Sequence, residues 1–433
     1  MLLRLAVSNF RSIYETIEFS LIAVDDDRPA ARAVPMMNHK VLTAAAIYGP
    51  NASGKSNVID ALYWLSNQVL NSMTSISERI PVSKFKFAEG PHRNTSIEVE
   101  MILEGVRYDY FVEFNEKEIV RESLHNYPLK KRRTVFERFE NVIEPSRNLK
   151  QRNALQELTT STTFLLSVGL KLKAPEIQEF ARSIAQIRYL GRFASSGTRM
   201  RPNVPPYLRD RTGTIFLEQQ ERMQLGLFGD RATESARDRD SAIQLLRFAD
   251  LGINDVKIEE ISASQDSEDQ LNRVTKRRQI QMLHTSNGEE VAFDLTEESL
   301  GTQKWFEYIG PMLGALKRGA PLVVDELDSG LHPNISERLV DFFRDPISNP
   351  RNAQLIFTTH DVHLMNALNR DEVWITERDE TGATTLTALA EYGRTAARKD
   401  ENLERAYIKG KYGGIPFLGD SPQLNALSAS NDR

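Results

Sequence analysis

The 433-residue sequence contains no cysteine, which excludes disulfide bonds, thiolate metal sites and cysteine nucleophiles. It also lacks any run approaching roughly 18 apolar residues, so it predicts no membrane-spanning helix. The opening residues, MLLRLAVSNFRS, have a short apolar run broken by Arg4 and no small-residue cleavage site, which is unlike a secretory signal peptide. These absences together indicate a cytoplasmic protein.

Neither internal repeats nor low-complexity tracts occur, and no heptad pattern persists long enough for a coiled-coil arm. The net charge of −5 is distributed unevenly. Residues 121–211 hold 18 Lys and Arg against 8 Asp and Glu, a balance of +10, which leaves −15 for the remainder. This basic segment indicates either a surface that contacts a polyanion or an ordinary solvated helical face rich in arginine. The residues predicted to contact a polyanion are Lys130, Lys131, Arg132 and Arg133.

Both ends of the chain show an α/β pattern. The N-terminal part predicts strands at 2–10, 16–23 and 41–48, then a loop and a helix over 56–70. The run VLTAAAIY at 41–48 is continuously apolar, which is typical of a strand buried on both faces. The C-terminal part predicts a helix at 299–317, a strand at 321–327, a helix at 334–345, strands at 353–360 and 372–379, and a helix at 402–410.

The middle of the chain has a different pattern. It predicts an antiparallel meander over 95–140 and mainly helices over 150–250, including one at 174–190. The helical pattern is interrupted by a Pro/Gly-rich loop at 195–208, and it is followed by strands at 255–262 and 277–283 with a polar stretch between them at 264–275. We therefore expect a nucleotide-binding fold split into parts 1–115 and 290–410, with an inserted region at 116–289 and a tail at 411–433. Residues 429–433 are predicted to be disordered.

The most specific motif is YGPNASGKSN at 48–57, which holds Gly49-x-x-x-x-Gly54-Lys55-Ser56 between a predicted strand and helix. In such a loop the glycines let backbone N–H groups surround the phosphates, and the helix directs its N-terminal dipole at them. Lys55 would neutralise the β- and γ-phosphates, and the Ser56 hydroxyl would ligate Mg²⁺. The predicted ATP-binding residues are Gly49, Pro50, Asn51, Ala52, Ser53, Gly54, Lys55, Ser56 and Asn57.

A second element, LVVDE at 322–326, places Asp325 at the end of a buried strand, where it can hold Mg²⁺. Glu326 beside it can polarise the attacking water as a general base. A DE pair after an apolar run is common. Its position downstream of a phosphate-binding loop, in the matching half of a split fold, is what favours this role.

Three weaker features have a suggestive order. Ser299-x-Gly301-Thr302 begins a predicted helix, Asp328 follows the predicted base by two residues, and His360 ends a buried strand. An imidazole at a strand end can contact a γ-phosphate, and a helix start can offer N–H groups to one. Taken singly, such a histidine is more often structural, and Ser-x-Gly is usually a helix cap. Their order and spacing carry the prediction.

The whole set resembles the ATP-binding-cassette type of AAA ATPase head, as in the SMC/RecF/OLD-like class. Walker A corresponds to Gly49–Ser56, the signature to Ser299–Thr302, Walker B to Leu322–Glu326, the D-loop to Asp328–Gly330 and the switch histidine to His360. The resemblance covers roughly residues 1–115 and 290–410. It implies an α/β P-loop NTPase with a mixed sheet, an antiparallel β-subdomain and an inserted, mainly helical region. It also implies ATP and Mg²⁺ as cofactors.

Further residues extend this resemblance. Asn9-Phe10-Arg11-Ser12 matches the N-F-R/K-S turn of these heads, and YIKGKYGGIPFLGD at 407–420 is similar to the tails of anti-phage and abortive-infection ATPases, such as RloA-like proteins and the Septu ATPase. The signature reads S-L-G-T where the defence ATPases often have S-D-G-T. No glutamine after the P-loop helix fits a Q-loop.

The resemblance implies that the ATP site is completed by Ser299, Gly301 and Thr302 of a second copy in a head-to-head homodimer. Residues 361–433 are too few for an appended Toprim nuclease, and the middle segment shows no metal-nuclease set. We therefore expect an ATPase that controls a separate effector, such as a nuclease, in phage defence. The alternative is a RecF-like clamp that closes on nucleic acid in DNA repair. A transporter ATPase fits the strand-rich N-terminus and the large insertion poorly.

Overall fold

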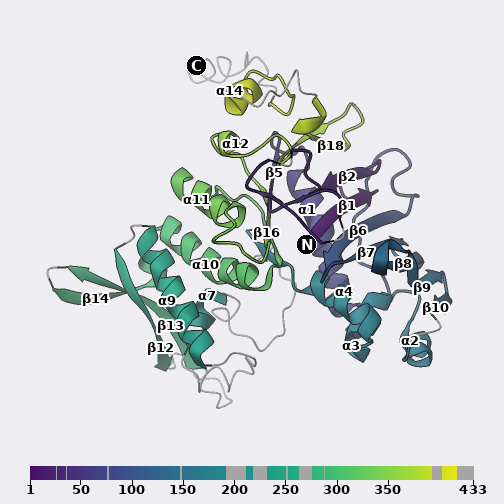
Figure 1. Cartoon of the computed structure of the whole chain (residues 1–433), viewed down its shortest axis with the longest axis horizontal. Coiled ribbons are helices and arrows are strands. Elements are labelled where there is room, and N and C mark those ends of the chain that lie inside the picture. The colour runs from purple at the N-terminus through teal and green to yellow at the C-terminus, as the bar shows by residue number, and fades with distance from the viewer. Residues whose placement is uncertain are drawn as a thin grey trace, which may run out of the picture.

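The computed structural model describes residues 1–25, 27–35, 37–75, 78–146, 149–191, 211–217, 232–249, 252–262, 276–286, 288–392 and 402–416. Two large sheets organise these residues (Figure 1). The predicted loop at 195–208, the polar stretch at 264–275 and the tail at 429–433 lie outside the described residues.

The central sheet has six strands in the order β11-β15-β16-β5-β17-β18. They are β5 (Ala44–Tyr48), β11 (Arg188–Leu190), β15 (Pro321–Val324), β16 (Gln354–Thr358), β17 (Val373–Arg378) and β18 (Thr384–Ala388). Every pair is parallel except β17 with β18. The carboxyl ends of β5, β15 and β16 therefore meet at one edge of the sheet, which is where α/β folds place their ligands.

Both faces of the central sheet are buried, as the apolar run in β5 requires. Ala45 and Ile47 of β5 face a core that includes helix α1 (Lys55–Asn71). Ala44, Ala46 and Tyr48 face a second core. That core is built by α9 (Ala232–Phe248), α10 (Leu300–Arg318), α11 (Pro333–Arg344), α12 (Leu364–Ala367) and α14 (Leu403–Ile408).

The second sheet is entirely antiparallel and has seven strands in the order β10-β9-β8-β7-β6-β1-β2. They are β1 (Leu2–Ser8), β2 (Ile17–Ser20), β6 (Thr95–Leu103), β7 (Val106–Phe114), β8 (Ile119–Tyr127), β9 (Arg133–Phe139) and β10 (Val142–Pro145). One face packs on α1 and on α3 (Leu165–Leu172) and α4 (Pro175–Ala185), with α2 (Arg152–Leu158) nearby (Figure 1). Helix α1 therefore lies between the two sheets.

A smaller antiparallel sheet joins β12 (Ile253–Ser262), β13 (Lys276–Ser286) and β14 (Glu289–Asp294). It is attached through α9, α10 and the short helix α7 (Arg211–Ile215), and β14 projects away from the rest of the molecule (Figure 1). A two-stranded ribbon, β3 (Ala31–Arg32) with β4 (Val41–Leu42), precedes β5. Within the described ranges, no helix is long and apolar enough to cross a membrane.

The predicted fold class is confirmed, because the structure has a mixed central sheet, an antiparallel sheet and helices α2, α3, α4, α7 and α9 between residues 116 and 289. Three local predictions were wrong. The run 41–48 forms two strands, because Val41 and Leu42 pair with β3 and only Ala44–Tyr48 enters the central sheet. The helix predicted to reach 190 ends at Ala185, because residues 188–190 pair with β15 as strand β11. The third error is one of omission, because strands β3, β10, β14 and β18 were not predicted.

The predicted boundaries of the inserted region, 116 and 289, remain a prediction. Residue 115 lies in the turn between β7 and β8, so the seven-stranded sheet takes strands from both sides of it. Strand β11, from within the predicted insertion, also belongs to the central sheet. The segment 116–289 thus contributes to both large sheets.

Candidate nucleotide-binding site

The loop between β5 and α1 has the backbone that its glycines allow. Gly49 has φ +147° and Gly54 has φ +105°, values that L-residues adopt rarely. A Cβ added to Gly49 would collide with Thr376, and one added to Gly54 would collide with Thr384. Glycine is therefore required at both positions for conformation and for space. Asn51 and Ala52 lie exposed at the loop surface.

Lys55 begins α1 and is buried, with only 7% of the residue exposed. Its Nζ donates to the carbonyl oxygens of Gly49 at 2.8 Å and Pro50 at 3.1 Å. Burial lowers the pKa of Lys55, and the carboxylates that follow β15 oppose this shift. The ammonium thus lies within the loop, where a P-loop lysine meets the β- and γ-phosphates.

The two predicted Mg²⁺ ligands touch each other. The Ser56 hydroxyl donates to Oδ1 of Asp325 at 2.8 Å, and the Thr358 hydroxyl donates to the same oxygen at 2.7 Å. Asp325 is 1% exposed at the end of β15, and Thr358 ends β16. A hydroxyl and a carboxylate oxygen, side by side at a phosphate-binding loop, are a donor set that fits Mg²⁺.

Glu326 leaves β15 in the left-handed region, with φ +56°. Its backbone N–H donates to the Thr358 hydroxyl at 2.8 Å, and its side chain is exposed. A non-glycine residue in this conformation costs about 1 kcal/mol and persists where surrounding contacts impose it. This conformation leaves the Glu326 side chain exposed, one residue after Asp325 in the chain.

The predicted D-loop and switch histidine are joined directly. Oδ1 of Asp328 accepts from the Thr359 hydroxyl at 2.7 Å and from the His360 N–H at 3.2 Å. Partial burial and the nearby Lys55 ammonium lower the pKa of His360, which the surrounding carboxylates oppose. The imidazole is thus favoured in its neutral form, which can donate one hydrogen bond and accept another.

The predicted signature residues lie at the start of α10. Ser299 is its N-cap, whose hydroxyl oxygen accepts from the Thr302 N–H at 3.1 Å and shares a 2.9 Å bond with the Thr302 hydroxyl. Thr302 is 4% exposed, so it holds Ser299 rather than facing solvent. Gly301 lies against the backbone of Gly330 in the D-loop, because an added Cβ would stand 3.0 Å from the Gly330 oxygen. Leu300, which lies between Ser299 and Gly301 in the chain, is 76% exposed.

A family model described as "AAA domain, putative AbiEii toxin, Type IV TA system" matches residues 44–366, more than half of the chain. The chain belongs to this AAA family. The matched span begins at β5 and includes the phosphate-binding loop, the signature, Walker B and His360. The family-level resemblance inferred from the motifs is thereby confirmed.

Among solved structures, this AAA protein is similar to an SMC head bound to the C-winged helix domain of ScpA, with 13% sequence identity and a TM-score of 0.44. That alignment covers 90% of this chain and 98% of the other. It is also similar to the SMC head domain from Thermotoga maritima, at 15% identity and TM-score 0.38, covering 89% and 98% of the two chains. Both TM-scores are below 0.5. No curated protein matches the sequence.

Sequence reasoning missed the hydroxyl groups that hold the phosphate-binding loop of this AAA protein. Thr376 of β17 shares a 2.6 Å bond with the Ser53 hydroxyl, and Thr384 of β18 donates to the Ser53 carbonyl at 2.8 Å. Ser12 shares a 2.7 Å bond with the Thr384 hydroxyl and accepts from the Asn57 amide at 2.6 Å. Asn57, predicted to bind ATP, therefore anchors the N-terminal turn. No motif marks Thr376 or Thr384, and both lie more than 300 residues from the loop in sequence. Ser12 belongs to the N-F-R/K-S turn, but that motif did not indicate its contact with the loop.

The C-terminal segment also contacts this region of the AAA protein. The ring of Tyr407 lies 6.1 Å from that of Tyr48, which ends β5. The Tyr407 hydroxyl donates to the Gly414 carbonyl at 2.5 Å, and the Gly414 N–H donates to Glu377 of β17 at 2.8 Å. The tail motif thus packs on the strands that carry the loop and its threonine support.

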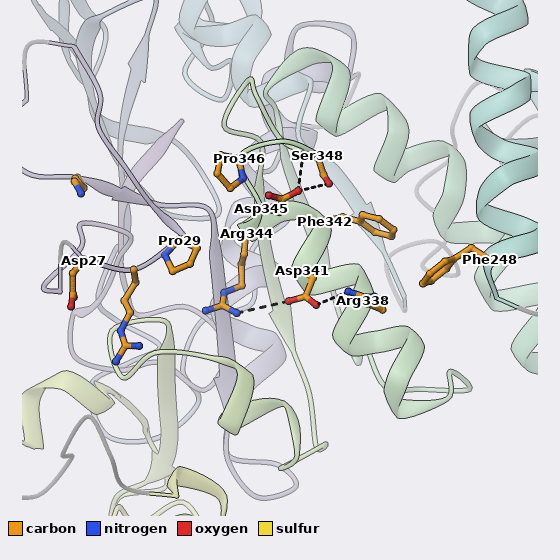
Figure 2. Close-up of a pocket in the computed structure, with 12 residues that line it drawn as sticks. Asp27, Pro29, Phe248, Arg338, Asp341, Phe342, Arg344, Asp345, Pro346 and Ser348 are labelled. Atoms are coloured by element: carbon orange, nitrogen blue, oxygen red, sulfur yellow. Dashed lines mark hydrogen bonds and ion pairs between the residues drawn. The ribbon is translucent and has the colours of Figure 1, made fainter.

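A cavity of about 880 Å³ lies elsewhere in the molecule (Figure 2). It is lined by Asp27, Arg28, Pro29, Lys40, Phe248, Arg338, Asp341, Phe342, Arg344, Asp345, Pro346 and Ser348. Lys40 precedes β5 and Ser348 precedes β16, so the cavity lies at the amino end of these strands. The phosphate-binding loop and Walker B lie at the opposite, carboxyl end, and the cavity is separate from the nucleotide site.

The predicted polyanion residues gather at the turn between β8 and β9, partly in a short helix, η2 (Pro128–Lys130). Lys130, Lys131, Arg132 and Arg133 are all exposed, and Leu129 beside them is 83% exposed. Arg132 also contacts His125, with 2.8 Å between Nη2 and Nε2. The structure therefore places four cations together on one exposed turn of the antiparallel sheet.

We predict that Thr384→Val weakens the loop of this AAA protein, because it removes the bonds to Ser53 and Ser12 at nearly constant volume. The expected effect is a loss of about 1–3 kcal/mol in the free energy of unfolding, with a weaker affinity for nucleotide. Urea unfolding and nucleotide titration measure the two effects. Thr385→Val, at the exposed neighbouring position of β18, is the matched control. Equal behaviour of the two variants would contradict the role given to Thr384.

Proposed function

We propose that this AAA protein binds and hydrolyses ATP with Mg²⁺ as a head-to-head homodimer, and that it controls a separate effector protein, such as a nuclease, in bacterial anti-phage defence. The observation that carries the ATPase proposal is the Ser56–Asp325 hydrogen bond, which joins residues 269 positions apart at the carboxyl edge of the central sheet. The defence role is supported by the family description, which names a toxin–antitoxin system, and by the likeness of the tail to RloA-like and Septu ATPases.

The residues have separate tasks in this proposal. The backbone N–H groups of 49–54, Lys55 and the α1 N-terminus bind the phosphates. Ser56 and Asp325 would hold Mg²⁺, which neutralises phosphate charge when bound. Glu326, exposed beside them, orients and deprotonates the attacking water. His360, neutral and tied through its N–H to Asp328, contacts the γ-phosphate.

The dimer proposal is supported by the exposed start of α10. In the described chain, Ser299 bonds only within its own helix and Gly301 lies against Gly330, so their outward side is available to another molecule. Leu300 adds a large exposed apolar side chain at the same place. A second copy would present this helix N-terminus to the γ-phosphate and enclose it in a donor-rich site. ATP then holds the two heads together, and hydrolysis releases them.

We expect Glu326→Gln to bind ATP, to remain dimeric with ATP and to lose turnover, because the amide cannot accept the proton of the attacking water. The loss is expected to be about 100-fold or more in kcat. Phosphate release and nucleotide titration measure turnover and binding. Glu337→Gln, at an exposed position of α11, is the control and should hydrolyse normally. Unimpaired turnover in Glu326→Gln would remove this residue from the base role.

Ser299→Arg should block ATP-dependent dimerisation without weakening nucleotide binding, because the bulky cation stands on the outward side of α10. Analytical ultracentrifugation with and without ATP measures the association of the two copies. Nucleotide titration checks that the phosphate-binding loop of each copy still binds ATP. Ser286→Arg, exposed at the end of β13, is the control. A Ser299→Arg protein that still dimerises with ATP would refute the composite site.

The second candidate function is a RecF-like, ATP-closed clamp on nucleic acid. The cluster Lys130–Arg133 favours it, because four exposed cations on one turn can contact successive phosphates. The defence proposal instead expects ATPase activity that does not need DNA, together with a stable complex with the product of a neighbouring gene.

If the clamp is correct, Lys130→Gln/Lys131→Gln should weaken ATP-stimulated DNA binding. The slope of log K against log salt should also become shallower by about 0.9 for each phosphate that the variant no longer neutralises. Filter binding of duplex DNA over a salt series measures this slope. Lys171→Gln/Lys173→Gln, which removes two exposed lysines elsewhere, is the matched control. Identical slopes for the two double variants would argue against the clamp.

A further inference from the structure

Strand β14 is an exposed edge. In the part of the chain that the structure describes, it lies at the end of the small sheet, with β13 as its strand neighbour. Five of its six residues are exposed and the sixth is half-buried. Val291 and Phe293 are 46% and 43% exposed, although they share a face with Met282 of β13, which is fully buried. The apolar face of the small sheet thus continues beyond the helices that cover it.

This edge lacks three of the features by which proteins protect a strand from pairing, although its charged side chains are a fourth. Short length, proline and bulges are common protections. Strand β10, at the edge of the seven-stranded sheet, has four residues and ends in Pro145. Strand β14 has six residues and no proline, and its register with β13 is continuous. Its backbone can therefore accept a further strand in the manner of β-augmentation.

The charges of β14 indicate what would pair with it. Glu289, Glu290 and Asp294 make half of its residues acidic. Two copies of β14 paired antiparallel about Ala292 would set Glu290 opposite Asp294 of the other copy, and like charges in that relation are destabilising. A strand that alternates lysine or arginine with apolar residues would instead set cations opposite Glu290 and Asp294 and would cover Val291 and Phe293. Glu290 already lies 3.8 Å from Lys257, and Asp294 accepts from the Thr296 N–H, so the added cations would join these contacts.

The edge is connected to the signature by a short, hydrogen-bonded segment. Asp294 forms a capping box with Glu297, and Glu298 directly precedes Ser299. Oε1 of Glu298 lies 2.6 Å from Nε2 of His284, whose ring packs edge-on against Phe293 at 5.2 Å. A strand that covers Phe293 would therefore act on the residues that fix the start of α10.

We propose that β14 is a docking edge for a partner protein, which adds an extended, basic and apolar segment as a fourth strand of the small sheet and thereby acts on Ser299 through His284 and Glu298. This partner would be the effector of the proposed function. The inference rests on the proposed function for the existence of that effector, whereas the docking edge itself is argued from β14. The partner's role is then to set the position of the signature, not only to be controlled by it.

The binding test uses the full chain without nucleotide, so it is independent of ATP hydrolysis. The probe is a fluorescent peptide of alternating lysine and valine, and fluorescence anisotropy measures its affinity. Glu289→Lys/Glu290→Lys should weaken binding by about tenfold and should bind a peptide of alternating glutamate and valine instead. Glu140→Lys/Glu144→Lys, at the β10 edge, is the matched control and should keep the wild-type preference.

Two results would overturn the proposal. The first is equal affinity of the lysine–valine peptide for both double variants, which would show only attraction to a chain of net negative charge. The second is undiminished binding of the same peptide after N-methylation of all its backbone amides, because methylation removes the N–H donors that strand addition requires. Failure of the Glu326 or Ser299 variants to behave as expected would leave this peptide result unchanged, so the two proposals are tested separately.

Discussion

The parallel pairing of β15, β16 and β5 is the constraint on which the site depends. Each of these strands is buried on both faces, and their carboxyl ends carry the Walker B residues, Thr358 and the phosphate-binding loop. Parallel pairing brings the carboxyl ends of the three strands to the same edge of the sheet. Ser56, which precedes Asp325 in the chain, and Thr358, which follows it, therefore donate to the same oxygen of Asp325. Any shift in register between these strands would separate the hydroxyl and the carboxylate that together fit a cation.

Much of this arrangement follows from local sequence. The loop needs glycines at two positions, an apolar strand before it and a helix after it, and all of these features are contiguous between residues 44 and 71. Walker B could be predicted from the sequence because Asp325 directly follows an apolar run. Strands β15, β16 and β17 and helices α1, α10 and α11 were therefore predicted close to their observed bounds. The family resemblance carried by the motifs then implied the fold class.

What was not predictable depends on pairing between distant segments. Residues 188–190 have no strand signal strong enough to end a helix, and only their register with β15 makes them a strand. Thr376 and Thr384 are ordinary strand threonines until β17 and β18 bring them to Ser53. Thr302, read as an outward contact, is a capping partner, because the first turn of α10 needs acceptors for its N–H groups.

The support of the phosphate-binding loop by β17 and β18 has a consequence for the order in which the protein is made. The neighbours of β5 in the sheet are β16 and β17, which follow it by more than 300 residues. During synthesis, the loop leaves the ribosome early. Strand β5, which carries the loop, can pair with β16 and β17 only after more than 300 further residues have been made. A nascent chain that stops before Thr376 carries the complete nucleotide motif in its sequence without the structure that shapes it. The loop therefore gains its supporting contacts only after β16, β17 and β18 have been made.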